Sequence, residues 1–150
     1  NPLKMSGELK DALAGADVFV GVSVAHALQP EWISRMGKKS IILALANPTP
    51  EIMPQDAVKA GAYVVATGRS DFPNQVNNAL AFPGIFRGAM DAKSIRITEG
   101  MQLAAAHALA GLVNNPTREH ILPPLFDTRV AKVIASAVKA QALKENVSRP

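Results

Sequence analysis

The residues best suited to binding a polar ligand lie in the stretch Ala66–Met90, where four side-chain amides stand within five positions. These amides are Asn74, Gln75, Asn77 and Asn78. An amide can donate N–H bonds to a carboxylate and can accept a bond from a hydroxyl group. Such residues also form turns and helix caps, but an apolar run over residues 79–82 follows at once, and every buried amide would need a partner. We therefore predict that this stretch binds a polar ligand.

Two phosphate-binding patterns are missing or incomplete. The chain contains no G-x-G-x-x-G, so it lacks the phosphate turn of a dinucleotide fold. Gly37-Lys38-Lys39-Ser40 is similar to the end of a P-loop. It fails because Lys39 replaces the required Ser or Thr and Trp32 replaces the first Gly. Neither pattern predicts a phosphate site.

No catalytic acid, base or metal ligand can be identified from the residues. The three histidines, His26, His107 and His120, are far apart and form no pair with metal-ligand spacing. The carboxylates show no evident acid–base pair among Asp17, Glu51, Asp56 and Asp71. The residues alone therefore identify neither a catalytic group nor a metal ligand in this chain.

Composition indicates one globular domain. The chain has 150 residues, of which 48% are hydrophobic and 19% charged, with no cysteine. The net charge of +4 comes from scattered basic residues without interleaved aromatics, which argues against nucleic acid as a partner. No segment approaches the ~20 apolar residues of a membrane span. We expect a cytoplasmic protein that has no membrane partner.

Three short apolar runs predict the strands Val18–Val22, Ile41–Leu45 and Tyr63–Ala66. Their starts are separated by 23 and 22 residues, and helices beginning at Pro30 (to about Met36) and Pro54 (to Ala60) fit between them. Strands alternating with helices at this spacing predict right-handed βαβ crossovers and the parallel sheet of an α/β domain. Because Val18–Val22 is continuously apolar, we expect this strand to be buried on both faces, and Ile41–Leu45 is expected to be a second buried strand.

The loops that leave the three strands share one edge of such a sheet. They are Gly21-Val22-Ser23, Asn47-Pro48-Thr49-Pro50 and Thr67-Gly68-Arg69-Ser70. Ligands of open parallel sheets bind beyond the carboxyl ends of the strands. The sequence therefore predicts that polar residues of all three loops face one crevice.

Further helices are expected at both ends of the chain. A short helix capped by Ser6 is expected within residues 1–14, and an alanine-rich helix is expected from about Glu99 to Val113. Asp127 should cap the last helix, whose apolar stripe has the spacing i, i+3, i+4, i+7, i+8. The stripe consists of Val130, Val133, Ile134, Ala137 and Val138.

Consecutive motifs of this sequence closely resemble those of the malic enzyme family, particularly its smaller bacterial members. The motifs are ALANPTPEI (Ala44–Ile52), ATGRSDFPNQVNN (Ala66–Asn78) and AFPGIFRGAM (Ala81–Met90). ADVFVGVS (Ala16–Ser23) and PPLFDTRV (Pro123–Val130) fit as well, so the resemblance covers essentially the whole chain.

The resemblance implies an enzyme that oxidatively decarboxylates L-malate to pyruvate and CO₂, using NAD or NADP and Mg²⁺ or Mn²⁺. It implies a Rossmann-like parallel sheet with flanking helices and a homo-oligomer. By resemblance, Asn47 and Asn78 bind the substrate and reach the nicotinamide, and Asn77 is the adjacent candidate for cofactor binding. Gly21, Val22 and Ser23 would lie along the dinucleotide.

The chain also departs from the family pattern. Family members are longer, and their tyrosine acid, lysine base, metal carboxylates and Gly-rich turn all precede the segment that this chain resembles. We therefore expect residues 1–150 to be the C-terminal part of a malic enzyme's NAD(P)-binding domain. Two alternatives stay open. One is a malolactic enzyme, and the other is a non-catalytic fragment that serves oligomerisation or cofactor binding.

Overall fold

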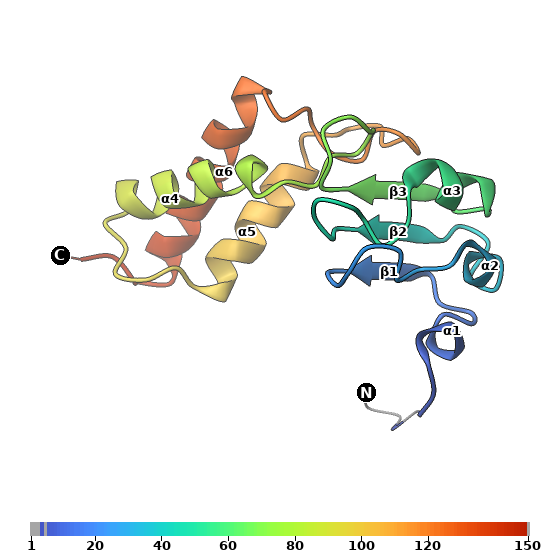
Figure 1. The fold of residues 1–150 in the computed structure, drawn as a ribbon. Coiled ribbons are helices and arrows are strands. Elements are labelled where there is room, and N and C mark those ends of the chain that lie inside the picture. Colours follow the sequence, from blue (N-terminus) through green and yellow to red (C-terminus); the bar gives the residue numbers. More distant parts are fainter. Residues whose placement is uncertain (1–3, 5, 150) are drawn as a thin grey trace. The chain divides into compact units, whose positions relative to one another are not determined.

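Residues 4 and 6–149 are described by the computed structural model, and the chain divides into two units. The first unit, residues 1–75, holds the sheet, and the second, residues 76–150, is helical (Figure 1). The prediction of one domain stays a prediction.

The sheet of the first unit has three parallel strands in the order β1-β2-β3 (Figure 1). β1 (Val18–Gly21), β2 (Ile41–Ala44) and β3 (Val64–Thr67) pair without a shift, so that Val18 faces Ile41 and Ile41 faces Val64. The strands start within one residue of their predicted positions. The α/β class and the parallel sheet are therefore confirmed.

Three short helices precede or connect the strands. α2 (Pro30–Ile33) and α3 (Pro54–Lys59) both begin at a proline, whose fixed φ suits the first helical position and whose missing N–H costs nothing there. α2 ends three residues before the predicted Met36. α1 (Leu9–Ala12) is only one turn long and begins after Glu8, so the prediction of Ser6 as its cap is wrong. The Asp11 carboxylate accepts a bond from the Glu8 N–H at 2.9 Å, and residues 1–3 and 5 of the predicted segment lie outside the described residues.

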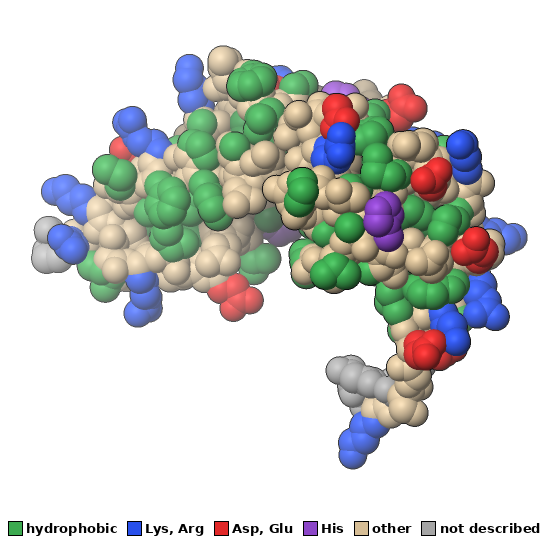
Figure 2. Space-filling model, in the orientation of Figure 1, with side chains coloured by type: hydrophobic (Ala, Val, Ile, Leu, Met, Phe, Trp, Pro, Cys, Tyr) green, Lys and Arg blue, Asp and Glu red, His purple; other side chains and the backbone are tan. Residues whose placement is uncertain are grey.

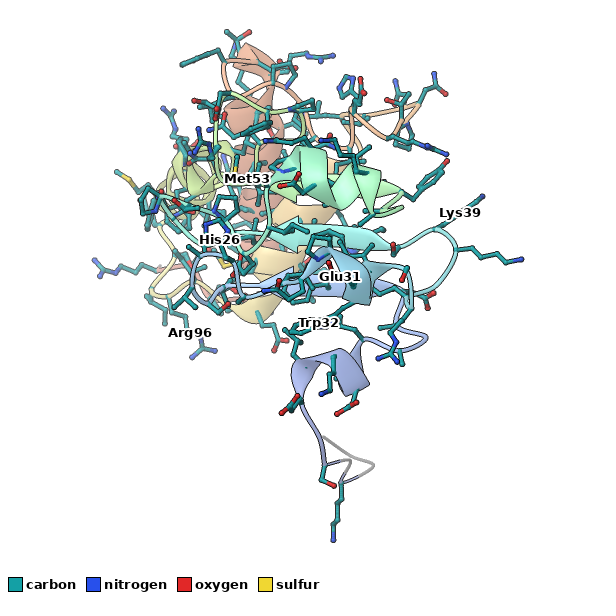
Figure 3. All side chains as sticks on the ribbon, turned by 45° about the vertical axis from the view of Figure 1, so that its right-hand side comes forward. His26, Glu31, Trp32, Lys39, Met53 and Arg96 are labelled. Carbon is teal, nitrogen blue, oxygen red and sulfur yellow. The ribbon has the colours of Figure 1, made fainter. Side chains whose placement is uncertain are left out.

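One face of the sheet packs against the helices and forms the core of the first unit. Phe19, Ile42 and Val65 share this face, and Trp32 of α2, labelled in Figure 3, is partly buried against the same core. On the opposite face Val18 is 48% exposed and Val20 is 58% exposed. The prediction of strands buried on both faces is therefore wrong for β1, although all four residues of β3 are buried.

The second unit packs three helices around its own core. A short 3₁₀ turn, η1 (Asn78–Leu80), leads into α4 (Phe82–Asp91), and α5 (Glu99–Ala110) and α6 (Thr128–Lys144) follow. α5 ends three residues before the predicted Val113. Asp127 caps α6 as predicted, because its Oδ1 accepts the Arg129 N–H at 2.9 Å.

The buried stripe of α6 matches the prediction in part. Val130, Ile134 and Val138 are buried, whereas Val133 is 38% exposed. α4 approaches α6 through two glycines, since a Cβ on Gly84 would stand 2.6 Å from Cβ of Ile134. Gly84 and Gly88 form a G-x-x-x-G pattern, which here marks close packing of α4 on α6.

Part of α4 presents apolar side chains to solvent. Phe82, Phe86 and Met90 are at least half exposed, and hydrophobic side chains show on the surface over α4 in Figure 2. The apolar run over residues 79–82, which leads into α4, is not buried as a whole, because Leu80 is buried but Phe82 is 50% exposed. Among the described residues, no helix has the length and apolar content needed to cross a membrane.

Candidate functional site at the carboxyl edge of the sheet

The loops after β1 and β2 meet at one edge of the sheet. Strand pairing continues beyond the strands, where the Leu45 N–H donates to the Gly21 carbonyl at 2.9 Å. Val22, Ser23 and Asn47 follow directly and are exposed. The peptide bond between Asn47 and Pro48 is cis, and no hydrogen bond to the Asn47 amide is formed within the described residues. The predicted site residues of these two loops therefore share one edge, with their polar side chains open to solvent.

A buried carboxylate, Glu51, joins these two loops. Its Oε1 accepts the Ser23 backbone N–H at 2.7 Å and the Ser23 hydroxyl at 3.1 Å. Its Oε2 accepts the backbone N–H of Ala46, the residue before Asn47, at 3.0 Å. The Glu51 side chain therefore ties the loop after β1 to the loop after β2.

Glu51 is charged although it is 0% exposed. Burial by itself raises the pKa of a carboxyl group, but the bonds from the Ser23 and Ala46 N–H groups outweigh it and leave the pKa of Glu51 below its ordinary value. No cation pairs with it in the described part of the chain. Neutral donors alone stabilise this charge.

Gly21 makes room for the Glu51 carboxylate. A Cβ at position 21 would stand 2.5 Å from Cδ of Glu51 and 2.8 Å from Cε1 of Phe19. Both distances are below any ordinary contact, so a side chain at position 21 would displace the carboxylate. Gly21 is required for this close approach and not for an unusual backbone angle.

The rest of the loop after β1 is fixed to the same segment. The His26 N–H donates to the Pro50 carbonyl at 3.3 Å, and the Leu28 N–H donates to the Glu51 carbonyl at 3.0 Å. Figure 3 labels His26 on this loop and Met53 just before α3. Residues 22–28 are thus held by residues 50–51 at three points.

The third loop, after β3, uses its polar groups mainly on itself. Asn74 is buried at a φ of 57°, and its Nδ2 donates to the Val65 carbonyl at 3.0 Å. Nε2 of Gln75 donates to the Gly68 carbonyl at 3.4 Å. The Arg69 guanidinium binds the Asp71 carboxylate through two bonds of 2.9 and 2.7 Å. These contacts explain Asn74 and Gln75 without a ligand.

Asn77 and Asn78 belong to the second unit and differ in their bonding. Oδ1 of Asn77 accepts the Ala79 N–H at 2.9 Å and so caps η1. Asn78 is exposed, and its amide makes no hydrogen bond within the described residues. Of the four clustered amides, Asn78 is therefore the one left free for a ligand. The prediction that polar residues of the three loops after the strands face one crevice stays a prediction.

Comparisons with known proteins identify the family. A family model described as "Malic enzyme, NAD binding domain" matches residues 8–143.

The chain belongs to the malic enzyme family.

Relatives in the malic enzyme family are similar over nearly the whole chain. The bifunctional malic/malolactic enzyme of Bacillus subtilis is 54% identical across 99% of the chain, which spans 37% of that protein. The NAD-dependent malic enzyme of Geobacillus stearothermophilus is 45% identical across 99% of the chain, which spans 31% of it. NADP-dependent malic enzymes also match. The chain thus spans about a third of the length of these relatives.

A solved malic enzyme has the same fold. The crystal structure of malic enzyme from Pyrococcus horikoshii superposes with a TM-score of 0.95 at 46% identity, covering 98% of this chain and 34% of the other. The Rossmann-like class predicted from the sequence is therefore confirmed.

The malic enzyme family implies two bound groups, a nicotinamide dinucleotide and a divalent metal ion. The described residues fit the first and do not fit the second. Ser23 and Asn47 are exposed residues at the carboxyl edge of a parallel sheet, and their hydroxyl and amide groups fit the polar, uncharged part of a nicotinamide dinucleotide. A metal ion is not fitted, because the described residues contain no group of three or more His, Asp or Glu side chains that could hold one.

Proposed function

We propose that residues 1–150 are the C-terminal part of the NAD(P)-binding domain of a longer, cytoplasmic malic enzyme. The proposed reaction converts L-malate and NAD⁺ or NADP⁺ to pyruvate, CO₂ and the reduced cofactor, with Mg²⁺ or Mn²⁺ bound by residues outside this segment. Family membership supports this proposal, and the observation that carries it is the fixed edge where Ser23 and Asn47 stand exposed. The nicotinamide would accept the hydride.

Binding and orientation would be the work of this chain's own residues. Gly21, Val22 and Ser23 would lie along the dinucleotide, held by Glu51. Asn47 and Asn78 would donate amide N–H bonds to the substrate carboxylate or to the cofactor carboxamide, and Asn77 is a weaker candidate because it already caps η1. A neutral amide orients a carboxylate without adding charge, and orientation of hydride donor and acceptor lowers the barrier.

A second activity has a specific observation behind it. The Bacillus subtilis relative, at 54% identity, is named for both malic and malolactic activity. The same binding edge could therefore serve conversion of malate to lactate and CO₂ without net reduction of the cofactor. A non-catalytic role in assembly of a homo-oligomer is the remaining alternative.

Product analysis of the complete enzyme separates these possibilities. Purified enzyme is incubated with L-malate, Mn²⁺ and either NAD⁺ or NADP⁺, and pyruvate, lactate and reduced cofactor are measured together. We expect pyruvate and reduced cofactor in equal amounts. Lactate without net reduction would instead establish malolactic activity, and the absence of both products would favour the assembly role. The 150-residue chain alone is expected to give no turnover, because its described residues hold no cluster that could bind the metal ion.

A further inference from the structure

The Glu51 carboxylate is an unusual group to find inside a loop region. It is 0% exposed, and no cation of the described residues compensates it. Transfer of a charge out of water is costly unless hydrogen bonds replace its hydration. Here two backbone N–H groups and one hydroxyl do so. An apolar residue at position 51 would avoid the cost of a buried charge but would leave the Ser23 and Ala46 N–H groups unpaired. The carboxylate is therefore tied to the positions of the two loops that supply these donors.

The bonds of Glu51 decide which groups remain free at the edge. The Ser23 and Ala46 N–H groups are both used by the carboxylate. A hydroxyl has a single proton, and the Ser23 hydroxyl gives its proton to Glu51. Its lone pairs therefore remain available on the exposed side. Ser23 is thereby fixed as a hydrogen-bond acceptor.

The charge of Glu51 also decides what this edge does not bind. A phosphate needs N–H donors and a positive or neutral surrounding. At Ser23 the backbone donor is already taken, and a fixed negative charge lies within hydrogen-bond distance. A phosphate that displaced water from Ser23 would meet this negative charge without a compensating donor and would be repelled by it. The edge therefore favours an uncharged ligand part that carries O–H or N–H donors.

We propose that Glu51 is a positioning residue for the nicotinamide-riboside half of the dinucleotide. It holds the Gly21–Ser23 loop and the turn before Asn47 together, orients the Ser23 hydroxyl as an acceptor and keeps the phosphates away from this loop. This inference rests on the proposed function, because it assumes that the complete enzyme binds a nicotinamide dinucleotide.

Binding of two ligands to the complete enzyme tests the inference. NADH or NADPH, whichever the wild type binds, is titrated by its fluorescence, and ADP is measured as its competitor. Glu51→Gln removes the charge and puts an NH₂ group against an N–H donor. We expect the Kd of the reduced cofactor to rise about tenfold or more, corresponding to about 1.4 kcal/mol per factor of ten, while the Kd of ADP stays unchanged because ADP lacks the nicotinamide riboside.

Matched variants keep the test decisive. Ile33→Ala opens a cavity in the core under α2 and belongs to neither loop. It should lower the melting temperature without changing either Kd. Ser23→Ala removes the exposed acceptor but leaves Glu51 its two backbone donors, so it should weaken the reduced cofactor selectively even if Glu51→Gln does not fold.

Three results would overturn the inference. These are unchanged cofactor binding in both edge variants, equal weakening of cofactor and ADP, or an effect of Ile33→Ala as large as that of Glu51→Gln. A wild-type enzyme that binds neither NADH nor NADPH would remove the proposed function itself. The wild-type titration thus distinguishes the two failures.

Discussion

Asn77 and Asn78 are neighbours with the same side chain, but their surroundings differ. Asn77 caps a helix, whereas Asn78 is available to a ligand. Oδ1 of Asn77 accepts the Ala79 N–H, whereas the Asn78 amide is exposed. In the complete enzyme, Asn78→Ala should lower kcat/KM, because a charge-assisted contact is lost. The ratio of the two kcat/KM values should correspond to about 2–3 kcal/mol of lost transition-state stabilisation. Its melting temperature should stay near that of the wild type. Steady-state kinetics and calorimetry measure the two effects.

Asn77→Ala is the matched control for this pair. Loss of a cap should cost about 1 kcal/mol of stability. Asn47→Ala applies the same kinetic test to the other exposed amide. The assignment of Asn78 fails if its alanine variant keeps normal kinetics but melts several degrees lower.

A charged cap gives α6 a defined response to acid. The guanidinium and then the N–H of Arg129 lower the pKa of Asp127 from 3.8 to about 2. A depressed folded-state pKa stabilises the fold above the ordinary value, and this contribution is lost as pH falls through the folded value. Asp127→Asn keeps an oxygen for the Arg129 N–H but removes the charge.

The contribution of the Asp127 charge is measured by comparing Asp127→Asn with the wild type across pH. The variant should melt at a lower temperature at pH 7, and the difference should shrink between about pH 4 and about pH 2. Thermal melts at several pH values measure this difference. A gap that does not change with pH would show that the ion pair with Arg129 contributes nothing to stability.

At the scale of elements, α4 packs so closely on α6 that neither Gly84 nor Gly88 leaves room for a side chain. A Cβ on Gly88 would stand 2.5 Å from the Ala135 carbonyl, which is backbone and cannot move aside cheaply. Gly88→Ala should therefore destabilise the second unit by about 1–3 kcal/mol, as overpacking does. Gly111→Ala, at the end of α5, is the control and should change stability by less than about 1 kcal/mol. Denaturant unfolding of both variants decides whether the packing is as close as described.

The elements that were predicted well are those with local signals. The prolines at 30 and 54 and the carboxylate of Asp127 fix helix starts through the bonding of their own backbone neighbours. The apolar runs located the strands for the same reason. The helix ends were less accurate, because packing and not propensity decides where α2 and α5 stop.

The candidate site was predicted less completely, because its organising contact is not local. Glu51 meets Ser23 across 28 positions of sequence, and in the sequence it was one carboxylate among several. Its setting between Pro50 and Ile52, soon after a strand, was the usable signal. The cluster of amides predicted more ligand groups than the structure leaves available. Asn74 donates to the strand before its loop, and Gln75 donates to its own loop. Burial of β1 on both faces failed because neighbours, and not composition, determine exposure.

At the scale of the whole molecule, the 150-residue chain should self-associate. β1 is one of the two edge strands of the sheet, and Val18 and Val20 on one of its faces are about half exposed. Edge strands with apolar faces recruit other chains through pairing and burial. Sedimentation of the purified chain at micromolar concentration should therefore show dimers or larger species.

A charged side chain on the exposed face of β1 should prevent this self-association. Val20→Lys is expected to shift the chain toward monomer, because an edge lysine opposes strand addition. Val58→Lys, on the exposed side of α3, is the matched control and should leave the association unchanged. If the wild-type chain is a monomer that melts cooperatively, the exposed edge and face of β1 do not cause self-association and the prediction is wrong.

The contact between Gly21 and Glu51 also constrains how this sequence can evolve. Neither residue can change alone without cost, since a side chain at 21 displaces the carboxylate and a shorter residue at 51 leaves the Ser23 and Ala46 donors unpaired. Lineages that replace the glutamate should therefore also acquire a substitute donor arrangement, and only in those lineages should alanine or a larger residue be tolerated at 21. Positions 21 and 51 should therefore co-vary, and a survey of malic enzyme sequences would show the two positions changing together.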